Sequence, residues 1–195
     1  MKFAALGLLT GLLFGLPLGP TGALCAQRCR EEGWQQGVLT ALGASAAEGV
    51  YAALALGLFW GLWSFQNIHR QALLLVGSCL FLALGVRSLL WPREELSPDW
   101  EEHSVSENFG AGLVVGFSIP GALLRFAAAR VFWNLPPMGW GGLLWPGAVA
   151  CGCLAGHLAA LWLTSASQVP LRKAERFWGG WFCAACLGFI LRAVL

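Results

Sequence analysis

The feature that most constrains the fold is an apolar segment broken in its middle by proline and glycine, which occurs twice. The first copy covers residues 11–24 (GLLFGLPLGPTGAL) and the second covers residues 112–123 (GLVVGFSIPGAL). Proline lacks a backbone N–H and clashes with the preceding turn, so each copy predicts a helix that stops and restarts. Breaks at matching positions of two halves are typical of membrane proteins that bind a small solute at mid-membrane depth.

Both copies lie within apolar runs long enough to cross a bilayer, which takes about 20 residues. We identify six such runs, at residues 3–26, 37–63, 72–91, 109–132, 143–164 and 177–195. The chain is 57% hydrophobic and only 11% charged, whereas about a quarter of the residues in a soluble domain are charged. The composition therefore predicts an integral membrane protein, and a net charge of +2 without a basic stripe argues against a nucleic-acid partner.

One long polar loop, residues 92–108, separates three runs from three runs and holds six of the ten acidic residues. Because three crossings are an odd number, the second half must enter the membrane from the opposite side. We therefore predict an all-α membrane protein with six transmembrane helices, arranged as two inverted three-helix repeats with broken first helices. The first repeat covers residues 1–91, and the second covers residues 109–195.

Lysine and arginine in the short loops predict the orientation, because such loops are enriched in them on the cytoplasmic side. Loops 27–37, 92–108 and 165–177 are the more basic group. We expect these loops in the cytoplasm, both termini outside, and the chain in the inner (plasma) membrane.

Glu48 is the only acid inside an apolar run. A charged side chain at bilayer depth costs at least about 2.5 kcal/mol, so Glu48 should face the protein interior and have a partner. Arg87, near the end of the third run, is the predicted partner. Arg125 and Arg130 follow the second break, and we expect them to reach the membrane surface. Glu48 is then a proton site, an anion facing a substrate ammonium, or one half of a structural ion pair.

His157 lies in the fifth run, at a position related to Glu48 by the repeat. Sliding the Ala-Ala-Leu of residues 52–54 onto that of residues 159–161 brings His157 within two positions of the counterpart of Glu48. A histidine pKa near 6.5 suits proton exchange, although a lone histidine can also be a hydrogen-bonded packing residue.

The breaks themselves are candidate binding elements. A helix that restarts after Pro20 presents free N–H groups and the positive end of its dipole, which favour a carboxylate. Simple kinks are the alternative. The predicted substrate-binding or gating residues are Pro17, Gly19, Pro20, Thr21, Gly22, Pro120 and Gly121.

Several of these motifs together resemble the LysE/RhtB family of amino-acid exporters. They are the first break (GLPLGP, residues 15–20), GVLTALGA at residues 37–44 followed by an acid, LGVR at residues 84–87, and the second break. The resemblance implies a six-helix inner-membrane efflux carrier with two inverted repeats. It marks Pro17, Gly19 and Pro20 as the signature of the first repeat, Glu48 as the acid where the family usually has aspartate, and Arg87 as its intramembrane partner. The second break reads Ile-Pro-Gly where the family has Asn-Pro-Lys, so the substrate stays open.

These patterns predict a proton-coupled exporter of an amino acid or similar zwitterionic solute. Its expected partners are that solute, protons and the lipid bilayer, with a homo-oligomer left open and no nucleic acid. We find no enzyme motif, and we expect no cofactor and no bound metal. The alternatives are a transporter of a metal or other small ion, for which Glu48, His157 and seven dispersed cysteines are a thin ligand supply, a thiol–disulfide electron carrier, and a membrane assembly protein without transport activity.

Overall fold

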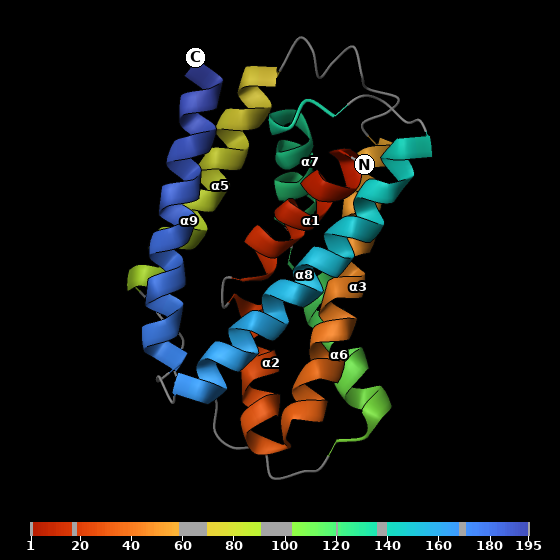
Figure 1. The fold of residues 1–195 in the computed structure, drawn as a ribbon. Helices are drawn as coiled ribbons and strands as arrows, with labels where there is room; N and C mark the ends of the chain where they lie inside the picture. The colour runs from red at the N-terminus through yellow and green to blue at the C-terminus, as the bar shows by residue number, and fades with distance from the viewer. Residues whose placement is uncertain are drawn as a thin grey trace.

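The computed structural model describes residues 2–16, 19–58, 70–90, 103–119, 121–135, 140–167 and 171–194, and these residues form helices and no strand (Figure 1). The predicted all-α fold is therefore confirmed for the described chain. The helices are α1 (Lys2–Gly15), α2 (Pro20–Glu31), α3 (Trp34–Leu58), α5 (Arg70–Leu90), α6 (Val105–Phe117), α7 (Ala122–Phe132), α8 (Trp140–Ser167) and α9 (Leu171–Val194).

Both predicted interruptions are present. The axis bends by 69° between α1 and α2, and by 67° between α6 and α7. At the first break Gly19 is extended and Pro20 opens α2, a position where a missing N–H costs nothing. Pro17 and Pro120 lie outside the described residues. The breaks are thus bends of nearly equal size at corresponding places in the two halves.

Some helices are long and apolar enough to cross a membrane. Among the described residues this holds for α3 and α8, through the stretches Trp34–Gly57 and Leu144–Ser165, and for up to four spans if each bent pair counts as one. The apolar stretches of α5 and α9 are shorter, Leu74–Leu90 and Gly179–Gly188. The stretch in α9 is short because that helix opens with the charged sequence LRKAER. These lengths are compatible with a membrane protein, and the count of six spans stays a prediction.

The helices pack in three close pairs, α1 with α8, α3 with α6 and α5 with α9. Glycine makes the first two contacts close. A Cβ added to Gly11 would lie 2.1 Å from the Val149 carbonyl oxygen, and one added to Gly112 would lie 2.0 Å from the Thr40 carbonyl oxygen. Side chains cannot occupy such positions, so these pairs depend on small residues, as helices in membranes often do.

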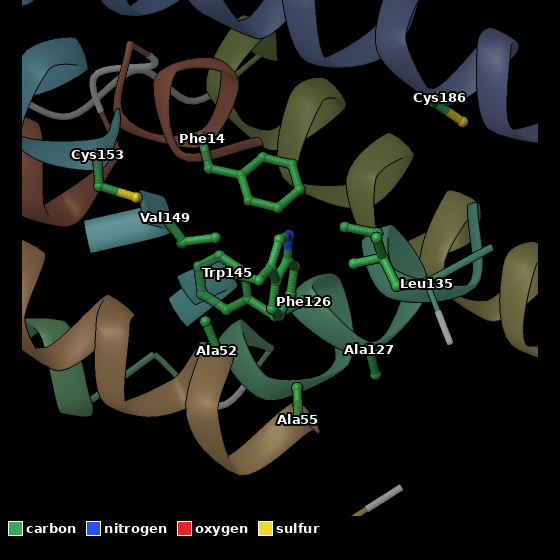
Figure 2. Packing of buried hydrophobic residues seen from close by; sticks show 11 residues of the cluster. Phe14, Ala52, Ala55, Phe126, Ala127, Leu135, Trp145, Val149, Cys153 and Cys186 are labelled. Atoms are coloured by element: carbon green, nitrogen blue, oxygen red, sulfur yellow. The ribbon is translucent and has the colours of Figure 1, made fainter. Parts of the chain in front are cut away.

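An apolar core lies where α1, α3, α7 and α8 meet (Figure 2). The Phe14 and Phe126 rings pack edge to face with centroids 5.4 Å apart, beside the fully buried Trp145. Cys153 and Cys186 are buried in the same cluster as free thiols, where a cysteine acts as a small packing residue. The core holds the end of α1 against the start of α7.

The two chain termini lie at the same end of the bundle, and the α2–α3 turn lies at the opposite end (Figure 1). His103, at the end of loop 92–108, contacts Glu32 in that turn. Two of the three loops predicted to be cytoplasmic therefore meet at one end. Which side of a membrane this end faces stays a prediction.

Candidate functional site

Glu48 lies near the middle of α3 and is only 2% exposed. Its neighbours along the helix are small: Ala44, Ala47 and Ala52 are fully buried. Small residues allow α6 and α8 to approach α3 closely, which encloses the carboxylate in protein. The prediction that this acid faces the interior is confirmed.

The partner of Glu48 is Arg125, in the first turns of α7. The guanidinium donates through Nη2 to Oε1 of Glu48, and Arg125 is 8% exposed. A buried charge needs such a partner, because an unpaired one is strongly destabilising. Arg125 follows the second bend, whereas Glu48 comes from the continuous helix α3.

This pairing corrects two sequence-based predictions. Arg87, the expected partner, is exposed on α5, which packs mainly against α9. Arg125 and Arg130, expected at the membrane surface, are both buried. The 67° bend before α7 turns that helix into the bundle and carries its arginines away from the surface.

His157 of α8 completes the site. Its Nε2 lies 3.7 Å from Oε2 of Glu48, and the side chain is 2% exposed. That distance is too long for a hydrogen bond, and it brings the two groups close enough for a charge interaction whenever the imidazole is protonated. The repeated Ala-Ala-Leu related His157 to the counterpart of Glu48 in the other half, and the structure places it beside Glu48 itself. We name Glu48, Arg125 and His157 the central cluster.

The central cluster contains polar atoms without partners. Glu48 Oε2, Arg125 Nε and both ring nitrogens of His157 are buried and have no hydrogen-bond partner among the described residues. Most buried polar atoms in folded proteins do have one, so such exceptions require an explanation. A polar ligand, or protons moving between these groups, would use these atoms.

Both breaks supply residues around the central cluster. Phe14, at the end of α1, and Phe126 of α7 lie beside Arg125, with their ring centroids 5.3 Å and 5.0 Å from its Cζ. Such distances allow cation–π attraction, which helps to hold the guanidinium. Cys25 of α2 lies near Glu48, and the Cys153 thiol of α8 is close enough to the carboxylate for a weak hydrogen bond.

The remaining predicted break residues lie outside the central cluster. Thr21 and Gly22 are buried in the first turn of α2, whereas Gly19, Pro20 and Gly121 are partly buried. Their predicted binding or gating role stays a prediction, since no contact between them and Glu48 is observed among the described residues.

A second group of charged residues, which sequence reasoning missed, lies at the end of the bundle where α2, α3 and α6 meet. Arg28 donates to Oε1 of Glu32, and His103 Nδ1 lies 3.0 Å from the same oxygen. Asn108 Nδ2 donates to Oε2 of Glu32 over 2.9 Å. We name Arg28, Glu32, His103 and Asn108 the end cluster. Its only signal in the sequence was the Ser-x-x-Glu capping box at Ser104, which the structure contains.

The end cluster shifts the titration of its acid. Burial raises the pKa of Glu32, but the hydrogen bonds from Asn108 and Arg28 lower it by more, and the result lies below the ordinary 4.5. Glu32 is therefore charged at neutral pH and fixes the first turn of α6 to the α2–α3 turn.

Neither cluster has the composition of a metal centre: within the described ranges, no group of three or more His, Cys, Asp and Glu side chains could hold a metal ion. The chain matches no protein-family model, and no curated protein or solved structure matches it significantly. Function is therefore inferred from the geometry of the central cluster.

Proposed function

We propose that this protein is a secondary transporter that exports an amino acid or a similar small zwitterion across the plasma membrane, coupled to protons. The observation that carries the proposal is the central cluster, a buried carboxylate and guanidinium with unpartnered polar atoms beside two broken helices. An ionisable residue within a membrane span is by default a candidate functional site.

The chemistry of the cluster suits a zwitterion. Glu48 would bind the ammonium of the solute, and Arg125 would bind its carboxylate. In the absence of solute the two side chains neutralise each other, so each charge has an opposite partner in both states. This exchange of partners avoids the cost of burying an unpaired charge. The first turns of α2 and α7 would add the positive ends of their dipoles.

The packing supports the inverted repeat that alternating access would use. With three helical units in each half, α1 and α6 are counterparts, as are α3 and α8. Packing of α1 on α8 corresponds under this exchange to packing of α6 on α3, and both contacts are present. The bends of 69° and 67° correspond in the same way. Rocking of two such halves around a central site is a common transport mechanism.

Proton coupling would use the contact between His157 and Glu48. Protonation of either side chain changes the charge of the cluster by one. Binding of a proton and binding of the solute ammonium at Glu48 would therefore compete, which links the movement of one to the other.

The test is a counterflow assay in proteoliposomes with a mixed pool of labelled amino acids, at pH 6 and pH 8. We expect uptake of one or a few amino acids by the wild type and no uptake by Glu48→Gln. Glu32→Gln is the matched control, because it makes the same change in the end cluster and should leave uptake intact. Size-exclusion chromatography checks folding, and Glu48→Asp, which keeps the charge but shortens its reach, replaces the glutamine variant if that variant does not fold.

Two results would contradict the proposal. Full uptake by folded Glu48→Gln would remove Glu48 from binding and coupling. Absence of any amino-acid uptake by folded wild type would exclude this substrate class, and the same vesicles would then be assayed with labelled ions.

A further inference from the structure

A cavity of about 340 Å³ lies between α1, α7 and α9. Its size is at the lower end of the range of about 300–1,000 Å³ typical of small-molecule sites. Its walls include Leu13, Phe14, Ala129, Trp133, Trp181 and Gly188. The role proposed above for the central cluster does not use this cavity.

The cavity and the central cluster share one neighbour, the Phe14 ring, and none of Glu48, Arg125 and His157 is among the described residues that line the cavity. Phe14 forms part of its wall, and the same ring packs beside the Arg125 guanidinium. Ala129 lies four residues after Arg125 on α7, so it faces the same side about 6 Å further along the helix. A solute whose charged groups bind Arg125 and Glu48 would reach this space with a side chain that passes the Phe14 ring.

The lining of the cavity selects for apolar groups. Among the described residues that line it, the polar side-chain atoms belong to Thr10 and Trp133, and these satisfy each other. Trp133 Nε1 donates to Thr10 Oγ1 over 2.9 Å, and that hydroxyl donates to the Leu6 carbonyl over 2.7 Å. A polar side chain entering the cavity would lose its hydrogen bonds to water without gaining new ones, whereas an apolar side chain would gain burial.

We infer that this cavity is the side-chain pocket of the transport site and that the solute is an amino acid with a large apolar or aromatic side chain. The inference rests on the proposed function, because it assumes that the central cluster binds the charged groups of the same molecule. It adds a substrate class that the central cluster alone does not define.

A pair of glycines on α9 gives a matched test. A Cβ added to Gly188, in the cavity wall, or to Gly180, one of the glycines of α9 outside it, would meet no atom within 4 Å, so leucine can be placed at either. Gly188→Leu should fill the pocket and raise KM for phenylalanine and leucine about tenfold or more, because even one extra or missing methylene in an apolar pocket changes specificity by about that factor. Counterflow of alanine should change little, and Gly180→Leu should resemble the wild type for every substrate.

The outcomes separate the inference from the proposed function. If the wild type exchanges serine or lysine as well as phenylalanine, and Gly188→Leu changes none of them, the side-chain pocket is wrong and amino-acid transport stands. If the wild type exchanges no amino acid, the proposed function itself fails. If Gly188→Leu slows every substrate equally and native mass spectrometry shows a lipid lost from the variant, a lipid chain occupies the cavity and the inference is overturned.

Discussion

The central cluster and the end cluster contain the same three charged or ionisable side chains, one glutamate, one arginine and one histidine, but their hydrogen bonding differs. In the end cluster both carboxylate oxygens of Glu32 have partners, since Arg28 and His103 contact one and Asn108 contacts the other. In the central cluster one carboxylate oxygen, Glu48 Oε2, and both ring nitrogens of His157 have none among the described residues. Among these same residues, the unpartnered buried atoms of the end cluster are Arg28 Nε and Asn108 Oδ1, and its carboxylate is fully paired.

This difference separates a structural joint from a candidate binding site. A carboxylate with every oxygen paired fixes the elements that contribute its partners, which explains how the end cluster holds α6 to the α2–α3 turn. Unpartnered buried polar atoms cost stability. A site that retains several of them at mid-bundle is therefore better explained by a ligand or proton that uses these atoms than by a role in folding.

The largest expected effect is that of Arg125→Ala. It leaves Glu48 buried without its counter-charge, which should lower the free energy of unfolding by about 3–5 kcal/mol. Arg28→Ala in the end cluster should cost less, about 1–3 kcal/mol, because Asn108 and His103 still contact Glu32. Thermal unfolding in detergent measures both.

A double variant checks the cause of that loss. Adding Glu48→Gln to Arg125→Ala removes the unpaired negative charge of Glu48 and should recover most of the lost stability. Equal losses for Arg125→Ala and Arg28→Ala, or no recovery in the double variant, would show that the two clusters do not differ as described.

Asn108→Ala should have an intermediate effect. The fully buried Asn108 bonds to Glu32 and Gln36, so its loss leaves buried polar atoms unsatisfied at a cost of about 1–3 kcal/mol. Counterflow at a temperature where the variant stays folded should match the wild type, because Asn108 lies in the joint. Loss of transport by the folded variant would give the end cluster a direct part in function.

The smallest effect is a dependence of stability on acid pH. The pKa of Glu32 is lower in the folded chain than its ordinary 4.5, so the unfolded state binds the extra proton first as pH falls. The carboxylate then stabilises the fold above pH 4.5, and this contribution is lost as pH drops below that value through the lowered pKa. Melting temperatures from pH 3.5 to pH 7 should show the loss in the wild type and a smaller one in Glu32→Gln. Parallel curves for the wild type and Glu32→Gln would contradict the predicted contribution of the Glu32 carboxylate.

The sequence alone determined the features that depend on local chemistry. Helix breakers within apolar runs predicted the two bends, a lone acid in an apolar run identified Glu48, and a repeated tripeptide singled out His157 as a residue at a repeat-related position. Each of these signals is contained in a few neighbouring residues or in the spacing of one repeat, so no knowledge of the packing is needed.

Only the tertiary structure decided which side chains meet. Arg87 and Arg125 both lie in apolar stretches, and the direction of the bend before α7 places Arg125 against Glu48 while Arg87 stays exposed on α5. The end cluster joins residues 28–36 to residues 103–108, and the cavity takes its walls from α1, α7 and α9. Contacts between segments far apart in the chain depend on the order and tilt of the helices, which local propensity and periodicity do not encode.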